Sequence, residues 1–170
     1  TKKQREKSLL RQGRAIAGEE KIEYINKLLF FDIETIFDSE SENLLRTYSV
    51  AWWMCDGDKD PVKFTEENID KYVKQTRMEI GKGSMDEFIN WIENNDTGIK
   101  YTLIGYNNSR FDNFPLLEGI IKSGTFTNMM YVQNSILKLK FYGRHEVFDL
   151  VRFVSASLKK ACRDFKTYPQ

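Results

Sequence analysis

The sequence predicts a mixed α/β domain built around a sheet core. Segments with strand-like patterns alternate with segments whose apolar residues recur at helical spacing. No repeat or low-complexity linker divides the 170 residues, which are enough to bury one sizeable core. The hydrophobic content of 41% and charged content of 30% are ordinary for a globular protein, and no apolar run is long enough to span a membrane.

The first half of the chain predicts strands before helices. Residues 27–37 form a continuous apolar run rich in large and branched side chains, typical of a central strand covered on both faces. The stretch "RTYSVAWWM" at 46–54 predicts a second strand, which the turn-rich "CDGDKDP" ends. Residues 62–65 predict a third strand that pairs back across this turn. The apolar residues of 66–80 have loosely helical spacing, so a helix is expected there.

A helix is predicted in "SMDEFINWIENN", where Ser84 and Glu87 have the spacing of a capping box. Residues 100–107 predict another strand, and "FPLLEGIIKSG" predicts a helix that ends near Gly124. The segments "MMYVQ" and "ILKLKFYG" predict a hairpin that turns at Asn134-Ser135. "EVFDL" predicts a last strand, and a helix follows from about residue 155.

Charge is unevenly distributed, which divides the chain into a basic arm at 1–26 and a domain at 27–170. Residues 1–14 contain one acidic residue, Glu6, and six basic residues: Lys2, Lys3, Arg5, Lys7, Arg11 and Arg14. A basic arm on a mildly acidic body predicts contact with a polyanion such as nucleic acid. The alternative is an arm that remains solvated.

Asp32 and Glu34 lie two residues apart inside the apolar run "FFDIETIF". Side chains alternate along a strand, so both carboxylates point to the face opposite Phe31 and Ile33. Two like charges that lose hydration on one face need compensation, and Mg²⁺ or Mn²⁺ supplies it through hard carboxylate oxygens. The alternative is a strand that ends at Phe31, with both carboxylates solvated in a loop.

A second polar cluster, "IGYNNSRFDNFPLLEG" at 104–119, follows a predicted strand. Asp112 stands at the junction with the next helix, from which it can reach a site at the sheet edge. Asn side chains and Phe111 suit contacts with the sugar, phosphate and base of a single strand. The alternative is that Asp112 or Asn113 only caps the helix.

Taken together, "FDIET" and "YNNSRFDNF" resemble the first and second exonuclease motifs of family B DNA polymerases, in the form of the protein-primed branch of phages, viruses and mitochondrial linear plasmids. "FDLVRFVSASLKKACRDF" is similar to a later stretch of that branch, although Leu150 stands where the branch often has Ser. The resemblance covers roughly residues 28–166. It implies a ribonuclease H-like (DnaQ-like) 3′→5′ proofreading exonuclease, with a mixed central sheet flanked by helices.

The resemblance also implies a role for each matching residue. Asp32, Glu34 and Asp112 would be catalytic carboxylates that bind two Mg²⁺ or Mn²⁺ ions for phosphodiester hydrolysis. The residues expected to hold a single-stranded DNA 3′ end are Thr35, Asn107, Asn108, Phe111, Ser157 and Leu158. The family's third motif, Tyr-x-x-x-Asp, does not occur before Gln170, and Asp149 and Asp164 do not fit it. We therefore expect weak or absent hydrolysis by the 170-residue chain.

Two further functions remain open. One is a catalytically inactive exonuclease-like remnant that binds nucleic acid within a larger assembly, such as a mitochondrial ribonucleoprotein or ribosome. The other is an unrelated ribonuclease H-like nuclease with a different fourth acid. The chain has only two cysteines, which predicts a reducing compartment. Its first residues lack the apolar core of a secretory signal, so an intracellular location with no membrane association is expected. Residue types with codons rich in A and T predominate, which is typical of phage, viral or mitochondrial genes.

Overall fold

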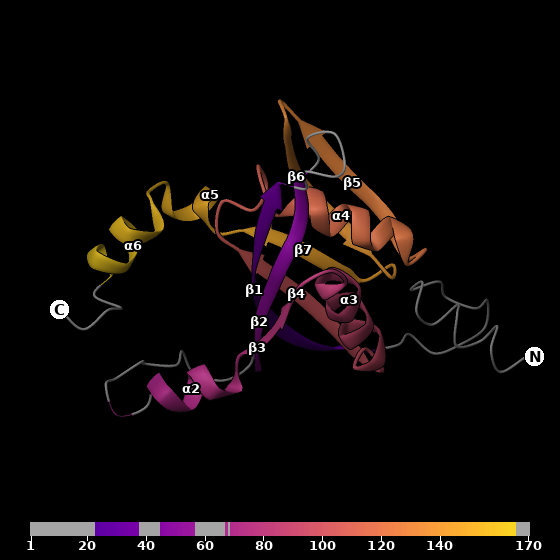
Figure 1. The fold of residues 1–170 in the computed structure, drawn as a ribbon, viewed down its shortest axis with the longest axis horizontal. Helices are drawn as coiled ribbons and strands as arrows, with labels where there is room; N and C mark the ends of the chain where they lie inside the picture. The colour runs from indigo at the N-terminus through magenta and orange to yellow at the C-terminus, as the bar shows by residue number, and fades with distance from the viewer. Residues whose placement is uncertain (1–22, 38–44, 57–66, 68, 166–170) are drawn as a thin grey trace, which may run out of the picture.

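The computed structural model describes residues 23–37, 45–56, 67 and 69–165. Within these ranges, seven strands alternate with five helices (Figure 1). The strands are β1 Ile25–Phe37, β2 Leu45–Asp56, β3 Arg77–Ile80, β4 Ile99–Gly105, β5 Phe126–Val132, β6 Ser135–Phe141 and β7 His145–Asp149. The helices are α2 Ile69–Gln75, α3 Ser84–Asn94, α4 Asn113–Lys122, α5 Val151–Val154 and α6 Leu158–Asp164.

All seven strands belong to one mixed sheet in the order β3-β2-β1-β4-β7-β6-β5. The sheet is antiparallel from β3 to β1, parallel from β1 through β4 to β7, and antiparallel again in β6 and β5. The predicted mixed α/β class, with a mixed sheet flanked by helices, is therefore confirmed. No described helix is long and apolar enough to cross a membrane.

The main core lies between the sheet and helices α3 and α4, which Figure 1 shows against the same face. On β1, Phe31 and Ile33 are buried in this core, whereas Asp32 and Glu34 are exposed. Phe31 stacks on Phe88 of α3, with ring centroids 6.2 Å apart. The predicted alternation along the first strand is confirmed, because its carboxylates face away from the core.

Several predicted elements differ from the structure. The segment expected to be one helix over 66–80 contains the short helix α2 and then β3, whose backbone pairs with β2 from Ser49 to Trp52. Because Gly83 is the N-cap of α3 with a φ of 105°, Ser84 lies inside the helix, and its buried hydroxyl makes no hydrogen bond. Glycine tolerates this left-handed backbone without steric cost. The capping-box prediction was wrong.

Other predictions need only a change of boundary or lie outside the described residues. The hairpin is present as β5 and β6, but its turn is Gln133-Asn134, one residue earlier than predicted, with φ values of 45° and 61°. The predicted helix ending near Gly124 is α4. The strand expected at 62–65 and residues 1–22 of the predicted arm lie outside the described residues. The end of the predicted arm, residues 25–26, belongs to β1.

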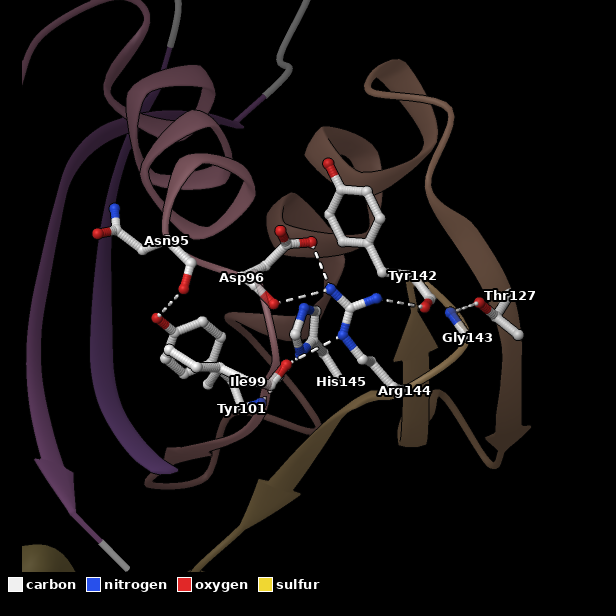
Figure 2. A network of polar contacts seen from close by, with 9 residues as sticks. All are labelled: Asn95, Asp96, Ile99, Tyr101, Thr127, Tyr142, Gly143, Arg144 and His145. Atoms are coloured by element: carbon white, nitrogen blue, oxygen red, sulfur yellow. Dashed lines mark hydrogen bonds and ion pairs between the residues drawn. The ribbon is translucent and has the colours of Figure 1, made fainter. Parts of the chain in front are cut away.

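A buried ion pair between Arg144 and Asp96 lies near the first residues of β4 and β7. Arg144 binds the Asp96 carboxylate at 2.5 Å and donates to the carbonyls of Asp96 and Ile99 at 3.0 Å each (Figure 2). Tyr101 donates its hydroxyl to the Asn95 carbonyl. Burial, and then the charge of Asp96, raise the pKa of Tyr101 to about 12.

Candidate functional site

The carboxyl ends of three parallel strands meet at one edge of the sheet. The pairing of β1 with β4 runs to Phe30 and Ile104, and the pairing of β4 with β7 runs to Gly105 and Asp149. Asp32 lies two residues after Phe30, the β1 member of the last β1–β4 pair. This edge is where open α/β sheets hold their ligands.

Asp112 follows β4 at this edge and occupies the N-cap position of α4. Its φ and ψ are −66° and −26°, and its side chain makes no capping hydrogen bond. Burial, and then the charges of Asp32, Glu34 and Asp149 in that order of importance, raise the pKa of Asp112 to about 7. Like charges act this way only within electrostatic reach. The three predicted carboxylates therefore lie within electrostatic reach of one another. The Asp112 side chain does not cap the helix.

The negative charge of this site has no protein counter-ion among the described residues. No salt bridge joins Asp32, Glu34 or Asp112 to a described cation. Carboxylate oxygens with uncompensated charge are the donor type that Mg²⁺ and Mn²⁺ prefer, so the residues fit such an ion in chemistry. However, no three His, Cys, Asp or Glu side chains in the described ranges lie close enough to form an assembled metal site.

Asp149, at the end of β7, anchors the loop that carries Asp112. Its side chain is 2% exposed and accepts backbone N–H bonds from Asn107 at 2.7 Å, Ser109 at 3.0 Å and Val151 at 3.1 Å. Three donors satisfy this buried carboxylate without a cation. Sequence reasoning set Asp149 aside because it fits no motif; the only indication was its position at the end of a strand.

Asn107 and Asn108, in the polar cluster at 104–119, differ in backbone conformation and in burial. Asn107 is half-buried and adopts a left-handed backbone with a φ of 59°, which Asn tolerates better than most residues. Asn108 is fully buried, and its amide donates to the Asn113 side chain at 2.8 Å. A Cβ on Gly105 would lie 2.8 Å from the Cβ of Asn108, so this approach requires glycine. Asn108 thus has no exposed surface for a nucleic-acid contact.

A cavity of about 300 Å³ is lined by Asp112, whereas Asp32 and Glu34 are not among its lining residues. Two predicted nucleic-acid contacts, Thr35 and Phe111, line it together with Asp112. Phe111 is 64% exposed, which leaves its ring available to a base. The remaining lining residues are Leu45, Arg110, Phe114, Pro115 and Glu118.

The last two predicted contacts, Ser157 and Leu158, do not line this cavity. Ser157 is the N-cap of α6 and accepts the Lys160 N–H at 3.3 Å, while Leu158 is exposed. The hydroxyl of Tyr106 donates to the Ala156 carbonyl and so connects this segment to the loop after β4. Ser157 has a local capping role that sequence reasoning did not weigh.

The fold and the site define a mixed α/β protein with acidic residues at the carboxyl ends of its parallel strands. No protein-family model matches the sequence, and a search of curated proteins finds no match either.

Proposed function

We propose that this chain is a ribonuclease H-like 3′→5′ exonuclease domain of the protein-primed family B DNA polymerase type. The observation that carries the proposal is the position of Asp32 and Glu34 just past the last β1–β4 pair and of Asp112 after β4, at the carboxyl ends of parallel strands and within electrostatic reach of one another. The mixed sheet with parallel β1, β4 and β7 at its centre is compatible with this fold.

In this proposal each group has a distinct task. Asp32, Glu34 and Asp112 hold Mg²⁺ or Mn²⁺, which when bound supplies activation of water and stabilisation of the leaving 3′ oxygen. Thr35 and Phe111 hold the terminal nucleotide in the adjoining cavity, where the Phe111 ring offers a stacking surface. Asn107 fixes the loop between them through its backbone bond to Asp149.

A second candidate function is a nucleic-acid-binding component without hydrolytic activity. The observation that favours it is that the described acidic side chains do not form an assembled metal site. In that case the cavity and its aromatic rim would bind single strands, and a divalent cation would not be required.

Binding of a fluorescent single-stranded oligonucleotide with a free 3′ end, with and without Mg²⁺, tests both functions. For the exonuclease, Mg²⁺ should strengthen binding, and Asp32→Asn or Asp112→Asn should remove that gain. Asp70→Asn on helix α2, which lies away from α4 in Figure 1, is the matched control and should behave as wild type. Trimming of the 3′ end, followed on a denaturing gel, should depend on the same two residues.

Binding that is equal with and without Mg²⁺, and equal in the Asp32 and Asp112 variants, would contradict the exonuclease and support the binding component. An absence of single-strand binding under all conditions would contradict both functions.

A further inference from the structure

Tyr131 on β5 presents an exposed aromatic ring that is held from two sides. Its side chain is 52% exposed, although its hydroxyl donates to the Asn134 side chain at 3.0 Å. Its ring meets Phe114 edge-on, with centroids 6.4 Å apart and an interplanar angle of 85°. A ring fixed before binding loses little conformational entropy when another planar group stacks on it.

Phe114 connects this ring to the candidate site. It belongs to the first turn of α4, is 40% exposed, and lines the same cavity as Asp112 and Phe111. Phe111, Phe114 and Tyr131 are therefore exposed aromatic residues that lead from the cavity beside Asp112 to the β5–β6 hairpin. In Figure 1, α4 lies beside this hairpin.

A cation accompanies the aromatic series. Arg110 is exposed, lines the cavity with Phe114, and has no ion pair with a described carboxylate, even though Glu118 lines the same cavity. Glu118 instead pairs with Lys122 at 2.7 Å. The Arg110 guanidinium is thus available for a phosphate, which it can bind with two parallel hydrogen bonds.

We propose that Phe114 and Tyr131 form a second base-binding subsite beside the carboxylate cavity, where an unpaired base stacks while Arg110 binds the adjacent backbone phosphate. The ligand is a single-stranded nucleic acid, because aromatic rings with a free guanidinium match alternating bases and phosphates. An apolar peptide would leave Arg110 without a partner. This inference rests on the proposed function, and it adds that the site holds at least two successive nucleotides.

The subsite predicts how affinity depends on ligand length. A mononucleotide occupies only the cavity, whereas a longer strand also reaches Tyr131. Stacking of a base on an aromatic side chain contributes about 1–3 kcal/mol, so Tyr131→Leu should weaken binding of an oligothymidylate by roughly tenfold. The same substitution should leave the affinity for thymidine monophosphate unchanged.

Fluorescence anisotropy with labelled oligothymidylates, and competition by thymidine monophosphate, measure these affinities on the full 170-residue chain in the presence of Mg²⁺. Tyr131→Phe keeps the ring and should bind as wild type. Phe126→Leu, which removes another exposed aromatic from the same strand, is the matched control and should also bind as wild type. Thermal melting of each variant verifies that it is folded.

The contribution of Arg110 has its own measurement. Arg110→Gln should reduce the slope of log affinity against log salt by about one, because one fewer phosphate is neutralised. Lys71→Gln on α2 removes an equal charge away from the site and should leave the slope unchanged.

The outcomes separate this subsite from the proposed function. Wild-type oligonucleotide affinity in Tyr131→Leu, together with weakened binding in Asp112→Asn, would overturn the subsite and leave the exonuclease proposal intact. An equal loss in Tyr131→Phe and Tyr131→Leu would also overturn it, because the hydroxyl and not the ring would then matter. Failure of the wild-type chain to bind any oligonucleotide would overturn both.

Discussion

At the scale of single residues, Asp112 departs most from its ordinary chemistry. A carboxylate at a helix N-terminus normally gains from the helix dipole, which favours its charged form by about 0.3–1 kcal/mol. Here the pKa of Asp112 is raised to about 7, by burial and then by Asp32, Glu34 and Asp149. Burial and like charge therefore outweigh the dipole. A divalent cation would reverse this balance, because it favours the charged form of every carboxylate around it.

The first prediction concerns the cost of charging Asp112. A carboxyl whose pKa is raised in the folded state stabilises the protein below that pKa, and this stability is lost as the pH rises from about 4 to about 7. Asp112→Asn removes the titration and should raise the free energy of unfolding at pH 8 by on the order of 1 kcal/mol, after allowance for solvent screening. Urea unfolding at pH 4 and pH 8 measures it. A variant that is less stable than wild type at pH 8 would contradict the electrostatic account.

His145 is the only histidine of the chain, and its pKa is shifted down, whereas that of Asp112 is shifted up. Its Nδ1 accepts the Tyr101 N–H at 2.9 Å, so the buried ring must be neutral. Burial, and then Arg144 and Lys100, lower the pKa of His145 to about 3 from the ordinary 6.5. The unfolded chain therefore binds a proton that the folded chain does not.

The second prediction follows from this difference. The stability contributed by neutral His145 is present above pH 6.5 and is lost as the pH falls from 6.5 towards about 3. In an NMR titration, the imidazole signal should keep its neutral chemical shift down to about pH 4, or until the protein unfolds. Titration of the folded protein near pH 6.5 would show that this ring is not buried as described.

At the scale of elements, the loop between β4 and α4 determines the site. Asp149 accepts N–H bonds from Asn107 and Ser109, and the Ile136 N–H of β6 donates to the Ser109 carbonyl at 2.8 Å. The Asn113 amide donates to the Ile136 carbonyl at 2.9 Å. This short loop, which leads to Asp112, is therefore attached to both β7 and β6.

The third prediction tests this attachment. Asp149→Asn keeps the shape of the side chain but turns an amide group towards backbone N–H donors, each of which loses a charge-assisted bond. We expect a loss of roughly 2–3 kcal/mol in the free energy of unfolding, with faster amide hydrogen exchange at Asn107 and Ser109. Unchanged exchange at both amides would contradict the anchoring role. The β1–β2 pairing serves as an internal control and should keep its protection.

Local patterns predict much of the fold, but not the parts that depend on distant partners. The alternation around Asp32 and the position of α4 follow from periodicity alone. Residues 77–80 look helical in isolation, and they form β3 because the edge of β2 offers backbone bonds. Asn108 matches a ligand motif, yet the close approach allowed by Gly105 places it in the interior. Asp149 belongs to the site only because β7 pairs with β4, a relation that no local pattern reveals.

At the scale of the whole molecule, the sheet brings together acidic residues that are far apart in sequence. Asp32 and Asp149 are contributed by β1 and β7, which lie on either side of β4 in the sheet. Helices α3 and α4 cover one face of this sheet, while Asp32 and Glu34 project from the other. The site is therefore a property of the strand order, and it exists only in the folded chain.

The fourth prediction concerns the basic arm, on the evidence of its sequence alone. Residues 1–14 contain five more basic than acidic residues, so contact with phosphates would release counterions. Deletion of residues 1–14 should weaken nucleic-acid binding and flatten its salt dependence, with little change in the thermal midpoint. A deletion that lowers the midpoint and leaves binding intact would instead mean that the arm packs on its own domain.

Manganese-induced line broadening in NMR spectra tests the central claim most directly, because Mn²⁺ broadens only resonances near its binding site. Substoichiometric Mn²⁺ should broaden the backbone amides of Asp32, Glu34 and Asp112 and leave those of α2 sharp. The combined Asp32→Asn and Asp112→Asn variant should lose this selective broadening. Broadening centred elsewhere, or none at millimolar Mn²⁺, would contradict a metal-binding carboxylate site at this edge of the sheet.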